Sequence, residues 1–192
     1  MRRENSQRRR PGNREPADRI LIVCGGVVTE PGYFEGLRQF YRNPAIKVVI
    51  KKKPVDPTSL VRHAATVRDN EADSFDDVWC VVDVDEFDLE PAVRLAEKKN
   101  ISLAVSNPCF ETWLVLHFAN QTAPLTCYAE ANRILLKFVP DYCKTRLDFA
   151  RYADGIELAV GRAEKLAARG REHLTNPASG VWALVRKFDR GR

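Results

Sequence analysis

The segment that most constrains the fold is VWCVVDVDEF at residues 78–87, an apolar, β-branched run that ends abruptly in acidic residues. Such a run suits a strand that is buried on both faces in a parallel sheet. Its acidic end would then lie at the carboxyl edge of the sheet, where open α/β sheets bind ligands. Residues two apart in an extended chain share a face, so Asp83 and Asp85 can point at one divalent cation. The alternative is a strand followed by a solvated acidic turn.

Strand and helix patterns alternate along the first part of the chain. Four apolar strand candidates lie at residues 19–28, 46–50, 78–87 and 101–106. Helical spacing of apolar residues fills the three intervals between them. This alternation predicts a three-layer α/β fold with a mostly parallel sheet of about four strands and right-handed crossovers.

The remainder of the chain has the patterns of helices and not of alternating strands and helices. Residues 109–119 are apolar nearly all round, which predicts a largely buried helix, and from Leu125 onward the patterns predict only helices. We therefore expect a tail at residues 1–18 and one domain at 19–192, made of an α/β core (19–119) and a helical extension (120–192). The extension is expected to pack on the sheet as a further helical layer.

The positive charge of the chain is concentrated in its N-terminal tail. The net charge is +5, and residues 1–19 hold seven arginines against three acidic residues, so the tail accounts for most of it. Because this segment has almost no apolar side chains, it is expected to be disordered when free. It is either a solubilising extension or a source of salt-sensitive phosphate contacts.

Several classes of location and site are disfavoured. No apolar run is long enough to span a bilayer and the N-terminus lacks the apolar segment of a secretory signal, so a cytoplasmic protein with no membrane contact is expected. The five cysteines are scattered and include no C-x-x-C pair, which predicts reduced core thiols rather than zinc ligands or disulfides. Of the three histidines none lies beside a candidate nucleophile, and His117 is interpreted as a satisfied core residue.

The chemistry that remains is that of carboxylates with hard metals. The chain has no phosphate-binding loop of the G-x-x-x-x-G-K-S/T form, no G-x-S-x-G and no H-E-x-x-H. Glu111 is an anomaly in its apolar helix, and it is a cation ligand, a charge near a helix N-terminus, or an exposed residue. Asp83 and Asp85 can hold Mg²⁺ or Mn²⁺ that binds phosphate oxygens and activates water.

Three runs and one later pair resemble the RloB-like family, which is similar to Toprim-fold nucleases that accompany ATPases in bacterial phage defence. The matching parts are ILIVCGGVVTEPGYFEGL, WCVVDVDEF and LAVSNPCFETWLVLHF, and then Tyr142 with Lys144. The most specific part is SNPCFE-x-W-L at residues 106–114. The resemblance covers most of residues 19–190.

The resemblance implies a Toprim-type sheet that cleaves DNA or RNA phosphodiesters with Mg²⁺ or Mn²⁺ in an abortive-infection type of defence. It makes Asp83 and Asp85 metal ligands, Glu111 a further site carboxylate, and Lys144 a phosphate or leaving-group contact. It also implies an ABC-type ATPase as partner, and it is compatible with a homo-oligomer.

The chain departs from the family in one motif. Where the family has C-E-G-E-x-T-E-P, this chain has Cys24 to Pro31 as CGGVVTEP, so that Gly25 and Val27 replace two acidic residues and Glu30 remains. A glycine has no side chain with which to bind metal. One hypothesis is an active nuclease in which Glu30 joins Asp83, Asp85 and Glu111 in binding metal.

Two other hypotheses stay open. One is a catalytically degenerate, Toprim-like regulatory subunit that binds nucleic acid or the ATPase. The other is a phosphatase of the haloacid-dehalogenase type, because Asp83-Val84-Asp85 has the D-x-D spacing of that class. Its context is poor, since that motif normally ends the first strand of the sheet.

Overall fold

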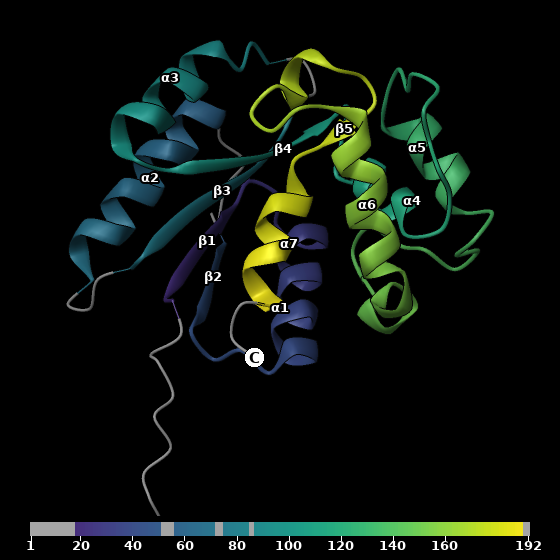
Figure 1. Cartoon of the computed structure of the whole chain (residues 1–192), viewed down its shortest axis with the longest axis horizontal. Coiled ribbons are helices and arrows are strands. Elements are labelled where there is room, and N and C mark those ends of the chain that lie inside the picture. Colours follow the sequence, from purple (N-terminus) through teal and green to yellow (C-terminus); the bar gives the residue numbers. More distant parts are fainter. Residues whose placement is uncertain (1–17, 51–55, 72–74, 85–86, 190–192) are drawn as a thin grey trace, which may run out of the picture.

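In a computed structural model, the described residues are 18–50, 56–71, 75–84 and 87–189. They form an α/β fold with a mostly parallel sheet, as the alternation of patterns predicts (Figure 1). The strands are β1 (Ile20–Cys24), β2 (Ile46–Ile50), β3 (Asp77–Asp83), β4 (Ser102–Asn107) and β5 (Ala178–Ser179). The α-helices are α1 (Thr29–Tyr41), α2 (Pro57–Asn70), α3 (Glu90–Lys99), α4 (Glu111–Leu116), α5 (Tyr128–Leu135), α6 (Ile156–Leu166) and α7 (Val181–Asp189).

The strand order is β2-β1-β3-β4-β5, and the first four strands run parallel. The chain moves from β1 outward to β2, and then returns past β1 to β3 and β4. The order therefore reverses between β1 and β3, which is the topological switch point where sheets of this type bind ligands. Asp83, the last residue of β3, lies at the carboxyl edge of the sheet.

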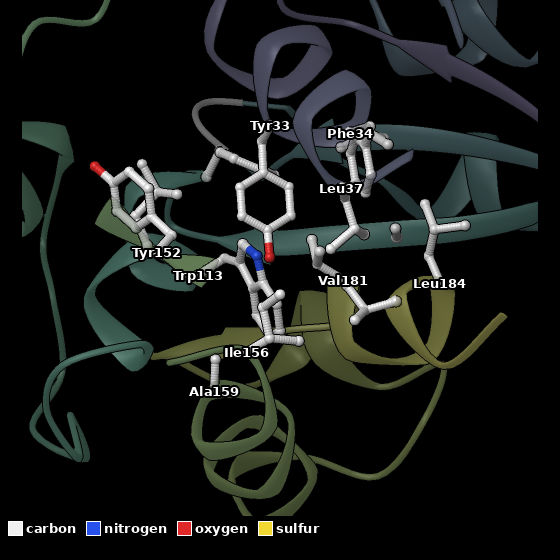
Figure 2. Close-up of a cluster of buried hydrophobic side chains, with 14 of the residues drawn as sticks. Tyr33, Phe34, Leu37, Trp113, Tyr152, Ile156, Ala159, Val181 and Leu184 are labelled. Carbon is white, nitrogen blue, oxygen red and sulfur yellow. The ribbon is translucent and has the colours of Figure 1, made fainter. Parts of the chain in front are cut away.

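Helices cover both faces of the sheet, which gives three layers (Figure 1). Because side chains alternate along a strand, Ile20, Ile22 and Cys24 enter one core, and Leu21 and Val23 enter the other. The first core is closed by α1, α4, α6 and α7, and the second by α2 and α3. Figure 2 shows the first core, where the Tyr33 ring lies among side chains from α4, α6 and α7.

One prediction about the C-terminal part is wrong: residues after Leu125 do not form helices alone. Ala178 and Ser179 form β5, which pairs antiparallel with Asn107 and Ser106 of β4. The Ser106 and Ser179 hydroxyl oxygens are 3.2 Å apart. A two-residue strand has no periodicity that a sequence pattern can reveal. The helical extension is thus joined to the sheet through β5 as well as through packing.

The cysteine prediction is correct for three residues and wrong for two. All five thiols are free, and Cys24, Cys80 and Cys109 are buried, but Cys127 and Cys143 are exposed. Both exposed cysteines lie in the helical extension, in loops where neighbouring apolar residues do not indicate burial. Within the described ranges, no helix is long and apolar enough to cross a membrane.

His117 is the satisfied core residue that the sequence predicted. It is 3% exposed, and its Nδ1 lies 3.0 Å from the carbonyl oxygen of Trp113. A carbonyl can only accept a hydrogen bond, so Nδ1 carries the proton and Nε2 accepts from the Tyr33 hydroxyl at 3.0 Å. Burial lowers the pKa of His117 to about 4, so the ring is neutral at neutral pH.

Candidate active site

A pocket of about 530 Å³ opens at the switch point between β1 and β3. Its walls come from the loop after β1, the first turns of α1 and α2, the end of β3, and a distant turn at Lys144 and Thr145. Three of the predicted site residues, Glu30, Asp83 and Lys144, line it. The rim is apolar, since Val27 and Phe87 are each 49% exposed there.

Glu30 enters the pocket from the first turn of α1. It is only 7% exposed, and its carboxylate is folded back against the backbone of Gly26. Burial is the main influence and raises the pKa of Glu30, and the nearby charge of Glu111 raises it further. Backbone hydrogen bonds from Glu30 itself and from Gly26, and the charge of Lys144, act in the opposite direction. Glu30 is therefore more easily protonated than an ordinary glutamate.

Glu111 is the first residue of α4 and is 1% exposed, which excludes the interpretation as an exposed residue. Its Oε1 accepts a hydrogen bond from the Tyr142 hydroxyl at 2.7 Å. Its buried Oε2 has no hydrogen-bond partner in the part of the chain that the structure describes. A buried carboxylate oxygen without a hydrogen-bond donor is suited to a cation.

Lys144 supplies the positive charge of the site. It lies in the turn from Cys143 to Arg146, which is closed by a backbone hydrogen bond of 2.9 Å between these two residues. Its carbonyl oxygen accepts a hydrogen bond from the Thr29 hydroxyl at 2.9 Å, which ties the turn to the start of α1. Its Nζ lies 4.5 Å from the centre of the Tyr128 ring, a cation–π contact.

The charges of three carboxylates act on Lys144. Burial opposes the charged ammonium, but the charges of Glu111, Asp83 and Glu30 outweigh burial and raise its pKa. Burial also raises the pKa of the Cys109 thiol, with further contributions from Glu111 and then Asp83. Glu30, Asp83 and Lys144 thus line one pocket, and the charge of Glu111 acts on both Lys144 and Glu30. Asp85 and Glu86 lie outside the described residues.

Carboxylates of the kind found here are the ligands that hard divalent cations prefer. Three carboxylates and one ammonium carry a net charge of −2 when all are ionised, and such a charge is costly in a half-buried pocket unless a cation balances it. Among the residues that are described, no three His, Cys, Asp or Glu side chains are close enough to hold a metal ion as they stand. Asp83, Glu30 and Glu111 are the residues that would hold Mg²⁺ or Mn²⁺, with the spare oxygen of Glu111 as one ligand atom.

Sequence reasoning missed several residues of the site. One is Thr29, the first residue of α1, whose hydroxyl donates a hydrogen bond to the carbonyl oxygen of Lys144. Tyr128, the ring beneath Lys144, and Gly26, against which Glu30 lies, were not singled out as site residues. Thr29 and Lys144 are 115 residues apart, so no local pattern could have related them.

Fold and site together define a three-layer α/β protein whose carboxylates gather at the switch point of its sheet. The chain belongs to the RloB-like protein family, whose family model matches residues 20–188. This match confirms the family that the sequence runs indicate. Searches of curated proteins and of solved structures found no match.

Proposed function

We propose that this protein is a Toprim-like, divalent-metal-dependent nuclease that hydrolyses phosphodiesters of DNA or RNA in a bacterial anti-phage system. The observation that carries the proposal is the pocket at the switch point, which Glu30, Asp83 and Lys144 line, together with the charge of Glu111 that acts on Lys144. Carboxylates are the protein ligands that Mg²⁺ and Mn²⁺ prefer, and phosphate esters are substrates that bind through such metals. The family match supports the same assignment at a coarser level.

Each site residue has a role in this proposal. A bound Mg²⁺ or Mn²⁺ would polarise the phosphate and lower the pKa of a water molecule. Asp83 and Glu111 would hold the metal, and Glu30 would either serve as a further ligand or accept the proton from the attacking water. That water adds to phosphorus while the bond between phosphorus and the leaving oxygen breaks. Lys144, a cation at neutral pH, donates a hydrogen bond to a phosphate oxygen and a proton to the leaving oxygen.

The proposal is tested with the purified full chain, supercoiled plasmid, single-stranded DNA and structured RNA. We expect cleavage of at least one substrate in Mg²⁺ or Mn²⁺ and none in EDTA. The assay is repeated with the ABC-type ATPase that we propose as partner, with and without ATP. Absence of cleavage in every one of these conditions would count against the nuclease.

A second candidate is a regulatory subunit that binds nucleic acid or the ATPase without cleaving. It is favoured by Gly25 and Val27, which stand where the related motif has acidic residues. It is also favoured by the lack of a ready three-ligand metal site in the described ranges. Nucleic-acid binding without hydrolysis, unchanged by EDTA, is the result expected of such a subunit.

Gly25→Glu separates the two candidates. A Cβ atom at Gly25 would lie 3.3 Å from the Val81 carbonyl oxygen and 3.6 Å from Leu60, so the Val81 backbone must move by a few tenths of an ångström to admit a side chain. In a competent site, the added carboxylate should raise Mn²⁺ affinity by about 10-fold, roughly 1.4 kcal/mol, and should increase cleavage. Isothermal titration with Mn²⁺ and the plasmid assay measure the two effects.

Gly161→Glu is the matched control, because it adds the same charge on α6 where a Cβ atom would meet nothing within 4 Å. It should leave Mn²⁺ affinity unchanged. If Gly25→Glu behaves like this control in both assays, the remaining carboxylates do not form a working metal site and the regulatory subunit is preferred.

A further inference from the structure

The carboxylate of Glu30 occupies the space that a side chain at Gly26 would need. A Cβ atom built on Gly26 would lie 2.0 Å from Oε1, 2.1 Å from Oε2 and 2.3 Å from Cδ of Glu30. Real Cβ atoms essentially never approach other heavy atoms within 3.0 Å. The present position of Glu30 therefore requires that residue 26 be glycine.

The reason for this glycine is space and not backbone conformation. Among the described glycines only Gly170 has a positive φ, so the backbone of Gly26 is one that other residues adopt. The neighbouring Gly25 has no such relation to Glu30, because its Cβ would approach Val81 and Leu60 instead. Gly26 alone makes room for the carboxylate.

The folded-back position decides where the charge of Glu30 acts. A glutamate in the first helical turn is usually solvated and stabilises the helix through its N-terminal dipole. Here the side chain is 7% exposed, its carboxylate lies against Gly26, and the charges of Glu111 and Lys144 act on it. It brings a carboxylate to the end of β1, where Gly25 and Gly26 have no side chain to offer.

We propose that Gly26 is a positioning residue, which seats the Glu30 carboxylate so that α1 supplies the acid that the end of β1 lacks. The role of that carboxylate in binding metal rests on the proposed function. The steric relation between Gly26 and Glu30 does not rest on the proposed function, because it involves only these two residues of the folded chain.

A double-mutant cycle, measured by thermal unfolding, tests whether Gly26 makes room for the Glu30 carboxylate. Gly26→Ala should lower the midpoint of unfolding by about 2 °C in the native background, because the buried end of the Glu30 side chain must leave its position. In a Glu30→Ala background the same change should lower it by no more than about 1 °C. Gly32→Ala is the control, because Gly32 lies on the same helix as Glu30 and a Cβ atom there would have its nearest contact at 3.6 Å. This variant should not be coupled to Glu30→Ala.

If Gly26→Ala alone does not fold, rescue of folding by Glu30→Ala supports the steric relation between Gly26 and Glu30 in the same way. Equal losses in the two backgrounds, or no loss in either, would overturn it. Failure of both the single and the double variant to fold would overturn it as well.

Manganese binding then tests whether the position of the Glu30 carboxylate contributes to metal affinity. Gly26→Ala should weaken Mn²⁺ binding by about 10-fold, although it removes no ligand, and Glu30→Gln should weaken it at least as much. Adding Gly26→Ala to Glu30→Gln should cause no further loss. Additive losses would contradict a role exerted through Glu30. If the native chain binds no Mn²⁺, the proposed metal site is wrong. The thermal double-mutant cycle still tests the steric relation between Gly26 and Glu30.

Discussion

Replacing Asp83 with asparagine is expected to reduce metal-dependent cleavage by at least about 100-fold, the scale seen when one electrostatic group is removed from an active site. Asp83 ends β3 at the switch point, and its charge acts on Lys144 together with those of Glu111 and Glu30. Asparagine keeps the size of the side chain but removes the charge that binds a divalent cation. Initial rates of cleavage in Mg²⁺ and in Mn²⁺ measure the effect.

Asp88→Asn is the matched control, since Asp88 is an exposed acid five residues further on. Its Oδ1 accepts a hydrogen bond from the backbone of Glu90 at 3.0 Å, which asparagine can also do. Cleavage by this variant should equal that of the native chain. Similar rates for Asp83→Asn and Asp88→Asn would remove Asp83 from the mechanism.

The stability of the native chain should fall as the pH drops below about 6.5, because His117 is buried in its neutral form. The pKa of His117 is about 4 in the folded chain, against about 6.5 for an unperturbed histidine in the unfolded chain. The unfolded chain therefore binds the proton first, and stability present above pH 6.5 is lost as the pH falls toward 4. The full loss is about 3 kcal/mol. Urea unfolding at several pH values between 7.5 and 4.5 measures it.

His117→Gln is the informative variant, because glutamine cannot titrate and keeps groups that can bond to Tyr33 and to the Trp113 carbonyl. Its free energy of unfolding should fall less steeply than that of the native chain over the same range. Parallel curves for the native chain and His117→Gln would show that His117 does not cause the pH dependence.

The sequence predicts the features that depend on local pattern. The apolar run that ends at Asp83 is a strand buried on both faces, because such runs have few other stable placements. Glu111 stands out for the same reason, since a carboxylate in an apolar helix needs a partner, and the structure gives it the Tyr142 hydroxyl. Lys144 came only from the family resemblance, and the structure places it beside the predicted carboxylates.

The features that the sequence could not predict depend on contacts between distant segments. β5 has two residues and forms only because β4 offers a free edge. The exposure of Cys143 follows from the turn that carries Lys144, and that turn is held by Thr29 on α1. The fit of Glu30 over Gly26 needs three-dimensional coordinates, because spacing along the chain does not show which way a side chain folds.

The most direct test of the proposed metal site is a titration of the purified full chain with Mn²⁺, in which electron paramagnetic resonance measures the concentration of the free ion. The account predicts saturable binding that is weakened at least about 10-fold by Asp83→Asn and by Glu30→Gln, and is unchanged by Asp88→Asn. Binding that is absent from the native chain, or that is equal in all four proteins, would contradict it.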